Sequence, residues 1–466
     1  MNGYMVVRGF FMFGLTFLFS SCVSDKSYRP VTDASLPKEE RCLYPGEVQQ
    51  SGEVQQSNFE VCTYKDDGKE YEYVVGYVEF DDQGWFQDVR QKDNLLHRLR
   101  KYHEQKNEEL LIVVFAHGWK HNADQNDDNV KHFHMLLKDL DMNERVAKSI
   151  DGRKSRKVVG VYLGWRGASL SLPILENLTF WTRKNAAERV GDRSAKQLLM
   201  ELNQFRSYCN NWDSSDRLAG PDQTQLVLIG HSFGGLIMYH ALHSELMGRA
   251  LQIRPDRHYR MAKSFGDFIL LVNPAFEGAA YEPLWQVGNT RCYSEKQRPI
   301  LAIVTSETDY ATKYAFPLGR FYTLTQSAPH PGERETVFKT VGHLGRYQTH
   351  RLLSKETQVE SKHHERQFEA AQKRVANLKV QPHVSTRQLP QAEFYGGTLE
   401  WLGNPQGRDH FPYLVITADK KIIDGHGDIW NAKFRDFMLD FVTKQVIEPV
   451  PDKDESNIDN KCLALE

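Results

Sequence analysis

The sequence lacks an excess of charge of either sign, because its 59 lysines and arginines nearly balance its 61 aspartates and glutamates. It also lacks clusters of lysine and arginine interleaved with aromatic residues, the pattern typical of a nucleic-acid-binding surface. Nucleic acid is therefore not expected as a partner. The charge balance itself selects no other partner.

Cysteine is scarce, with six residues in a chain of 466. None of the cysteines has the spacing of a zinc site, and the neighbouring histidines His132 and His134 lack acidic or cysteine partners at useful intervals. We therefore expect no metal and no other cofactor. In an oxidising compartment, Cys42 and Cys62 form the expected disulfide, because they bracket a short polar segment.

A hydrophobic run long enough to cross a bilayer comfortably is missing near the N-terminus. The apolar stretch from Phe10 to Phe19 follows Arg8 and ends at Ser20-Ser21-Cys22. Small residues before a cysteine resemble a bacterial lipoprotein signal, although Phe19 stands where an aliphatic residue is usual. We expect residues 1–21 to be a signal peptide and Cys22 to carry a lipid, which places the protein in the periplasm or at the cell surface. A plain cleaved signal or an uncleaved anchor would also place it outside the cytoplasm.

The most informative pattern that is present is Gly230-His231-Ser232-Phe233-Gly234, directly after the apolar run 226–229. A strand that turns sharply into a helix projects its middle residue, and glycines beside that residue prevent collisions of Cβ atoms. Ser232 is therefore the predicted nucleophile, and Gly230, His231 and Gly234 form the predicted nucleophile elbow. The competing interpretation is a glycine-rich turn whose serine only caps the helix.

A general base is expected on a loop between the last strand and the last helix. Residues 411–417 read as a strand, and residues 429–442 have apolar side chains at helical spacing. His426 lies between these segments and is flanked by glycines, so we predict that it is the general base. His343, in another loop-like stretch next to glycine, is its main rival.

The acid that orients the base is expected after another buried strand, residues 299–305. Asp309 follows that strand and is the predicted acid. Glu307 is close enough to compete, and Glu277 is the alternative if the acid lies one strand earlier.

The second donor of an oxyanion hole is expected after an earlier strand, residues 110–116. His117-Gly118-Trp119 follows this strand, and its glycine lets the backbone approach a substrate. The backbone N–H of Gly118 or Trp119 is predicted to pair with that of Phe233. His117 has at most a positioning role. A tight turn with an aromatic plug is the alternative for this segment.

Together these motifs resemble the α/β-hydrolase superfamily over residues from about 70 to 445. Within it, Phe115 to Ala123 and Thr305 to Asp309 resemble a poorly characterised group of lipase-like or esterase-like serine hydrolases. The resemblance implies a mostly parallel central sheet flanked by helices, with Asp309 as acid and His426 as base. It names no substrate, and the absence of a longer glycine run after His117 departs from one well-known lipase subgroup.

One large domain with insertions is expected between a polar tether and a tail. The expected parts are the tether at 22–68, the α/β-hydrolase domain at 69–447, its insertions at about 168–220 and 355–400, and the tail at 448–466. The first insertion is apolar, which favours a lid or an acyl pocket, or equally an extra helix pair packed at the sheet edge. The second ends in aromatic and glycine residues that fit a wall of the site or a hairpin beside the last strand.

The resulting function is an exported serine esterase or lipase that forms an acyl-enzyme on Ser232. The expected partners are a small-molecule or lipid ester and, through Cys22, a membrane. Acyl transfer with the same three residues remains open. So does an inactive binding lipoprotein that keeps the hydrolase scaffold. The sequence does not specify the acyl chain, the oligomeric state or the physiological role.

Overall fold

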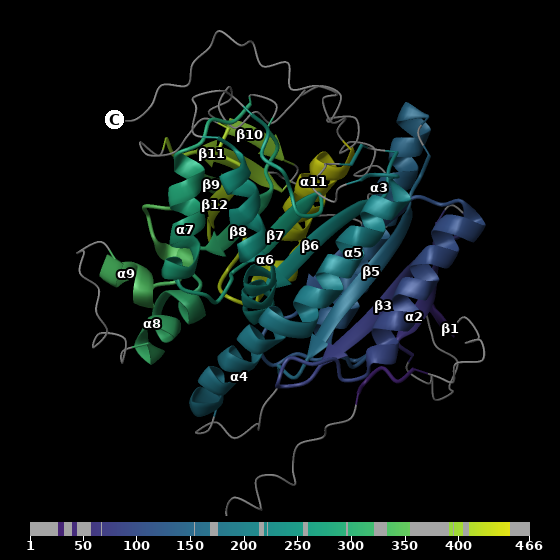
Figure 1. Cartoon of the computed structure of the whole chain (residues 1–466), viewed down its shortest axis with the longest axis horizontal. Coiled ribbons are helices and arrows are strands. Elements are labelled where there is room, and N and C mark those ends of the chain that lie inside the picture. Colours follow the sequence, from purple (N-terminus) through teal and green to yellow (C-terminus); the bar gives the residue numbers. More distant parts are fainter. Residues whose placement is uncertain are drawn as a thin grey trace, which may run out of the picture.

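Twelve strands of the described chain form one sheet with helices on both faces (Figure 1). The computed structural model describes residues 27–31, 40–43, 57–66, 68–152, 154–167, 176–213, 219–220, 222–254, 260–294, 297–320, 333–354, 391–394, 396–403 and 410–447. The strand order is β1-β2-β3-β5-β4-β6-β7-β8-β12-β9-β11-β10. The chain is thus an α/β protein with a mostly parallel sheet, as the sequence predicts at this level.

The centre of the sheet consists of parallel strands whose side chains are almost all buried. These strands are β3 (Lys69–Phe80), β5 (Lys157–Trp165), β4 (Leu110–Ala116), β6 (Gln225–His231), β7 (Phe268–Val272), β8 (Leu301–Ser306), β12 (Tyr413–Ala418) and β9 (His350–Leu353). Continuous apolar runs are expected where helices cover both faces of a parallel sheet. The carboxyl ends of these strands define one edge, which we call the upper edge.

Alternate residues of each strand enter two separate cores. In β6, Leu226 and Leu228 enter one core, and Val227 and Ile229 enter the other. The first core includes side chains of α2 (Val89–Arg100), α5 (Lys196–Cys209), α6 (Phe233–Gln252) and α7 (Gly278–Asn289). The second includes side chains of α3 (Asp128–Asp151) and α11 (Ala432–Ile447). Helices on opposite faces therefore seal the sheet that carries the loops of the upper edge.

Both ends of the sheet carry antiparallel strands. At one end, β2 (Phe59–Asp66) pairs antiparallel with β3, and β1 (Glu40–Leu43) pairs parallel with β2. At the other end, β10 (Gln391–Phe394) and β11 (Gly397–Trp401) form a hairpin, and β11 pairs antiparallel with β9. The aromatic and glycine-rich end of the second predicted insertion is thus a hairpin, separated from β12 by β9.

Part of the region predicted as a tether belongs to the folded domain. Phe59–Asp66 forms β2, and Arg29 is buried against Glu60 and the Tyr77 ring. The polar side chains of this region pair with one another in the interior, so its polarity did not mean exposure. The folded domain therefore includes β2 and Arg29, which lie before the predicted boundary at residue 68.

The first predicted insertion contains two described helices. α4 (Glu176–Val190) and α5 follow one another through a short π-helical turn, Gly191–Ala195, and α4, α5 and the turn contact α6. Leu198, Leu199 and Leu202 of α5 enter the first core. This part of the insertion is therefore a helix pair packed on the sheet.

The predicted signal peptide, Cys22 and the C-terminal tail lie outside the described residues. Within the described part of the chain, no helix has the length and apolarity needed to cross a membrane.

Candidate active site

Ser232 stands at the turn between β6 and α6, and its backbone has φ 56° and ψ −118°. A non-glycine residue adopts this left-handed region only when its surroundings enforce it. A Cβ on Gly230 would lie 2.7 Å from the carbonyl oxygen of Gly234, and one on Gly234 would overlap the Ala116 carbonyl. The glycines predicted for the elbow are thus required by backbone packing.

His426 bridges Ser232 and Asp309. Its Nε2 lies 2.7 Å from Ser232 Oγ, and its Nδ1 lies 2.8 Å from Asp309 Oδ2. An ionised carboxylate only accepts hydrogen bonds, so Nδ1 carries the proton and Nε2 accepts from the serine hydroxyl. The structure therefore brings together all three residues that the sequence predicted, from loops that follow β6, β8 and β12.

Asp309 is fully buried. Burial alone raises the pKa of a carboxyl, but hydrogen bonds and charge from His426, together with two hydrogen bonds from Thr312, hold the pKa of Asp309 below its ordinary value. Thr312 donates from Oγ1 to Asp309 Oδ2 at 2.5 Å and from its backbone N to Oδ1 at 3.1 Å. Asp309 is thus an ionised carboxylate in a buried position beside an imidazole.

His343, the rival base, lies behind the acid. Its Nε2 is 2.9 Å from Thr312 Oγ1, which itself donates to Asp309, so the imidazole donates to the threonine. Burial lowers the pKa of His343 to about 4, so it is neutral at neutral pH. His343 therefore supports Asp309 through Thr312 and makes no described hydrogen bond to Ser232.

The loop that carries His426 is held by hydrogen bonds to the backbone carbonyl oxygen of His426. Asn273 Nδ2 donates to the His426 carbonyl oxygen at 2.9 Å, and His231 Nε2 donates to the same oxygen at 3.0 Å. Asn273 Oδ1 accepts from the Ser306 backbone N at 2.9 Å. Asn273, in the left-handed region at φ 45°, thus ties the ends of β7 and β8 to the histidine loop. The sequence prediction missed its role.

Two further bonds fix the same loop to the segment after β8. Ser306 Oγ donates to the Ile423 carbonyl oxygen at 2.7 Å, and the Gly425 backbone N donates to Thr308 Oγ1 at 3.0 Å. Both partners belong to the segment that presents Asp309. Asp309 and His426 are therefore positioned by one connected set of hydrogen bonds.

The predicted oxyanion segment lies against the serine. A Cβ on Gly118 would lie 2.9 Å from Ser232 Cβ and 3.1 Å from His231 Nδ1, so only glycine lets this backbone pass. Phe233 is the first residue of α6 and follows the serine directly. The backbone of Gly118 and the N-terminus of α6 thus both adjoin Ser232, where donors would meet a developing oxyanion.

His117 holds the oxyanion segment and does not reach the serine. Its Nδ1 donates to the Gly118 carbonyl oxygen at 2.9 Å, and its Nε2 accepts from the Trp165 backbone N at 3.2 Å. Burial lowers the pKa of His117 to about 4, and its ring stacks on Trp165 with centroids 5.6 Å apart. The positioning role predicted for His117 fits these contacts.

Aromatic rings from the first insertion reach the nucleophile elbow. The ring of Phe180 in α4 lies 4.9 Å from that of Phe233 and 5.5 Å from that of Trp119, centroid to centroid. Trp181 and Phe316 extend the group, 5.7 Å apart. The side of the site next to the oxyanion segment is thus an apolar wall.

The alternative acids are occupied elsewhere. Glu277 forms ion pairs with Arg320 and with Lys184, the latter at 3.1 Å. Glu307 accepts from the Lys420 backbone N and pairs with Arg351. Neither has a described hydrogen bond to His426.

A cavity of about 400 Å³ adjoins Glu277 but not the serine. Its lining residues are Trp181, Lys184, Asn185, Glu188, His240, Glu277, Ala279, Ala280 and Arg320. The ion pairs of Glu277 with Lys184 and Arg320 already balance the charges within it. It is therefore a polar hollow behind the apolar wall, separate from the hydrogen-bonded Ser232.

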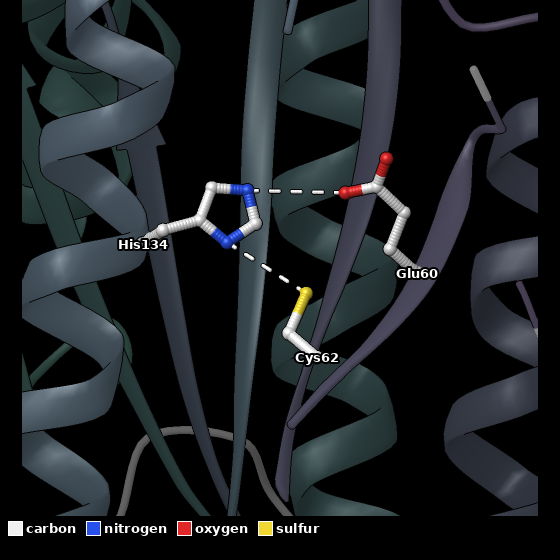
Figure 2. Close-up of side chains that lie close together, drawn as sticks. All are labelled: Glu60, Cys62 and His134. Carbon is white, nitrogen blue, oxygen red and sulfur yellow. Dashed lines mark hydrogen bonds and ion pairs between the residues drawn. The ribbon is translucent and has the colours of Figure 1, made fainter. Parts of the chain in front are cut away.

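One buried group has the spacing of a metal site: Glu60, Cys62 and His134 (Figure 2). The fold brings Glu60 and Cys62 to His134, although the sequence showed no such partners. Cys62 is disulfide-bonded, and β1 places Cys42, its predicted partner, opposite it. The side chain of Cys42 lies outside the described part. A disulfide sulfur is not the thiolate that a metal requires.

The other two members of the group are also engaged. His134 Nε2 donates to the Tyr77 hydroxyl at 2.9 Å, and Nδ1 accepts from the Tyr73 hydroxyl at 3.1 Å. Tyr77 in turn donates to Glu60, which pairs with Arg29. Burial lowers the pKa of His134 to about 4. The group is thus a satisfied hydrogen-bond network of the core, and its residues do not fit a metal ion.

Comparisons with known proteins add little. No protein-family model matches the chain, and no curated protein matches it. Among solved structures, the chain is similar to the phospholipase PlaB from Legionella pneumophila in complex with thio-NAD, with a TM-score of 0.20 and 12% identity. The match covers 54% of this chain and 47% of that chain, so it spans about half of either protein. A likeness this weak carries no argument, and the functional conclusion depends on the geometry of the site.

Proposed function

We propose that this protein is a serine hydrolase with an α/β-hydrolase fold that cleaves carboxylic esters through an acyl-enzyme on Ser232. The observation that carries the proposal is the continuous hydrogen-bonded chain from Ser232 Oγ through His426 to the buried Asp309, with distances of 2.7 and 2.8 Å. Chain order supports it as well, because serine, acid and histidine come in that order, after the parallel strands β6, β8 and β12.

In the first half-reaction, Ser232 Oγ attacks the ester carbonyl carbon while His426 Nε2 takes the hydroxyl proton. Asp309 stabilises the imidazolium that forms and keeps its Nδ1–H in place. The imidazolium then gives its proton to the leaving alkoxide oxygen. The alcohol departs, and the acyl group stays bound to Ser232.

In the second half-reaction, water takes the place of the alcohol. His426 Nε2 removes a proton from the water as its oxygen attacks the acyl carbon, and then returns a proton to Ser232 Oγ. The products are the carboxylic acid and the regenerated enzyme. The backbone N–H groups of Phe233 and of Gly118 or Trp119 stabilise the negative oxygen in both tetrahedral intermediates.

The apolar wall beside the site favours a hydrophobic acyl or aryl group on the substrate. Phe180, Trp119 and Phe233 pack together next to the serine, and such a surface gains free energy by covering apolar atoms. A lipid ester fits this description. Transfer of the acyl group to another alcohol uses the same residues and is the second candidate.

Export belongs to the proposal and depends mainly on the sequence. The apolar segment Phe10 to Phe19 and Ser20-Ser21-Cys22 support a lipoprotein signal with lipidation of Cys22. The disulfide at Cys62 also favours an oxidising compartment. Mass spectrometry of the membrane fraction tests this part directly, since a mature chain that begins with an acylated Cys22 is expected.

The decisive experiment is hydrolysis of p-nitrophenyl esters of increasing acyl length by the purified protein, beside Ser232→Ala and His426→Ala. Both variants are expected to lose at least a thousandfold in kcat/KM, because nucleophile and base act as one unit. A fluorophosphonate should label the parent protein and leave Ser232→Ala unlabelled.

Each result separates the candidates. Faster release of p-nitrophenol with an added alcohol, together with the new ester as product, would favour acyl transfer over hydrolysis. A folded parent protein that neither turns over esters nor reacts with the fluorophosphonate would contradict the proposal and favour a binding scaffold.

A further inference from the structure

Large apolar side chains are exposed on the upper edge of the sheet, on both sides of Ser232. Leu318, Tyr310 and Trp85 are exposed by 71%, 67% and 56%. The set, which we call the apolar rim, is completed by Tyr314, Val89 and Tyr28. Single exposed apolar residues are ordinary on a protein surface, but a group gathered around a site indicates a contact surface.

Chain topology explains why the rim surrounds the site. Trp85 and Val89 follow the carboxyl end of β3, whereas Tyr310, Tyr314 and Leu318 follow the carboxyl end of β8. In the sheet, β3 lies three strands to one side of β6, and β8 lies two strands to the other. With about 4.8 Å between neighbouring strands, the ends of β3 and β8 are about 24 Å apart, and the end of β6, which carries Ser232, lies between them.

The segment that follows the N-terminal apolar stretch is fixed to the same edge. Ser27 Oγ and the backbone N atoms of Tyr28 and Arg29 donate to the carboxylate of Glu79, the penultimate residue of β3. Arg29 also donates from Nε to the Ala123 carbonyl oxygen at 2.7 Å. The chain therefore enters the domain on the upper edge.

Chain length limits how far this edge can be from a membrane anchor. Ser27 is only five positions after Cys22, and a fully extended chain covers at most about 3.6 Å per position, or about 18 Å in total. The apolar stretch Phe10 to Phe19 ends three positions before Cys22. An anchor of either kind, acyl or peptide, would therefore hold the upper edge near the bilayer surface.

Cationic side chains accompany the rim in the arrangement that suits a bilayer interface. The Arg193 guanidinium lies 5.0 Å from the centroid of the Trp85 ring, and Lys313 Nζ lies 5.5 Å from that of Tyr314. Tryptophan and tyrosine favour the headgroup region, where lysine and arginine reach lipid phosphates. The anchored N-terminal segment joins the domain at the same edge as the rim, which favours a bilayer over a water-soluble partner as the occupant.

We propose that the apolar rim is a lipid-binding face that docks the upper edge onto a bilayer and presents Ser232 to ester lipids of that bilayer. The choice of substrate rests on the proposed hydrolase function, whereas the docking of the rim does not. Trp85, Tyr310 and Leu318 enter the interface, and the apolar wall at Phe180 receives an acyl chain of a lipid from the bilayer.

The docking is tested by quenching of tryptophan fluorescence with brominated lipid. The full-length Ser232→Ala protein, which cannot consume the vesicles, is mixed with phosphatidylcholine and phosphatidylglycerol vesicles (3:1) with or without brominated acyl chains. In that background, Trp85→Phe should lose at least half of the bromine-dependent quenching. Trp212→Phe, which removes a partly buried tryptophan just after α5, should leave it unchanged.

The substrate is tested with a rim variant, Trp85→Ser/Tyr310→Ser/Leu318→Ser, in the full-length protein with Ser232 intact. Its rate on vesicle phospholipid, divided by its rate on soluble p-nitrophenyl butyrate, should fall at least tenfold. Tyr208→Ser/Leu251→Ser removes exposed apolar residues in the last turns of α5 and α6, which run to the opposite edge, and this control should keep the parent ratio.

The outcomes distinguish this proposal from the hydrolase itself. Loss of quenching in Trp85→Phe without ester turnover by the parent would support the lipid face and contradict the hydrolase. Ester turnover with equal quenching in Trp85→Phe and its parent would overturn the lipid face and leave the hydrolase standing. A rim variant that changes only the oligomeric state would assign the rim to a second copy of the chain and would also overturn it.

Discussion

Asn273 donates a hydrogen bond of 2.9 Å from Nδ2 to the backbone carbonyl oxygen of His426. The two residues are 153 positions apart, and the contact joins the end of β7 to the loop after β12. It acts on the backbone of the proposed base and leaves its ring free for Ser232 and Asp309. The orientation of the imidazole therefore depends on a residue outside the hydrogen-bonded chain of Ser232, His426 and Asp309.

Asn273→Gly should lower kcat by about 10- to 100-fold with little change in KM. Glycine tolerates the φ of 45° but removes the amide that holds the His426 carbonyl, and misplaced catalytic groups cost rate at this order. Steady-state kinetics on a p-nitrophenyl ester measure the split. Asn211→Gly is the matched control, because Asn211 also has a positive φ of 54° but lies after α5. Equal kinetics for both variants would argue against a positioning role for Asn273.

Thr312→Val should lower kcat about tenfold and shift the loss of activity on the acid side to higher pH. Thr312 Oγ1 helps to hold the pKa of Asp309 below its ordinary value, so removing this donor raises that pKa, and the carboxylate is neutralised earlier as pH falls. A pH profile of kcat measures the shift. Thr312→Ser keeps the hydroxyl and should restore the parent profile. If the pH profile of kcat of Thr312→Val is not shifted on the acid side, Thr312 contributes packing but does not set the pKa of Asp309.

The three central residues were predictable because each occupies a position with its own local signal. Ser232 lies in a glycine motif after an apolar strand, and Asp309 and His426 follow later strands in the expected order. Carboxyl ends of parallel strands meet at one edge, so the order along the chain was enough to bring the loops together. Hydrogen bonds then set the final distances.

Asn273 and Thr312 were not predictable in the same way. The role of Asn273 depends on a contact with a segment distant in the sequence and on a left-handed backbone that no local motif indicates. Thr312 lies only three positions after Asp309, but no motif indicates that its hydroxyl donates to the buried carboxylate. The strand Phe59–Asp66 had a signal that was overlooked, since Phe59 and Val61 alternate with polar residues at the period of a strand. Polar residues such as Glu60 made this segment look like an exposed tether, because their buried partners are brought to them only by folding.

Gly118→Ala should reduce kcat/KM at least a hundredfold without unfolding the protein. The added methyl would lie 2.9 Å from Ser232 Cβ, so either the serine or the oxyanion segment must shift, and loss of one oxyanion donor alone costs about 2.7–4 kcal/mol in the transition state. Kinetics and a thermal unfolding curve check the two parts of the prediction. Gly248→Ala in α6 has no atom within 4 Å of the new methyl and should retain full activity. An active Gly118→Ala enzyme would remove this segment from the oxyanion hole.

His134→Gln should make the protein less sensitive to acid. Burial lowers the pKa of His134 to about 4 from 6.5, so between these values the unfolded chain binds the proton and the folded chain does not. The free energy of unfolding therefore falls as pH drops through this window, and His134 contributes about 2 kcal/mol to the fall between pH 7 and pH 4.5. Glutamine does not titrate, and its amide can still donate to Tyr77 and accept from Tyr73.

Urea unfolding at pH 7 and pH 4.5 measures this difference. The free energy of unfolding of the parent should fall by about 2 kcal/mol more than that of His134→Gln. His97→Gln, at a solvent-exposed position on α2, serves as the control and should follow the parent. The same fall in parent and His134→Gln would mean that His134 is protonated in the folded protein. In that case its Nδ1 could not accept from Tyr73, and the hydrogen-bond directions assigned to the network of Glu60, Tyr77 and His134 would have to be reversed at that nitrogen.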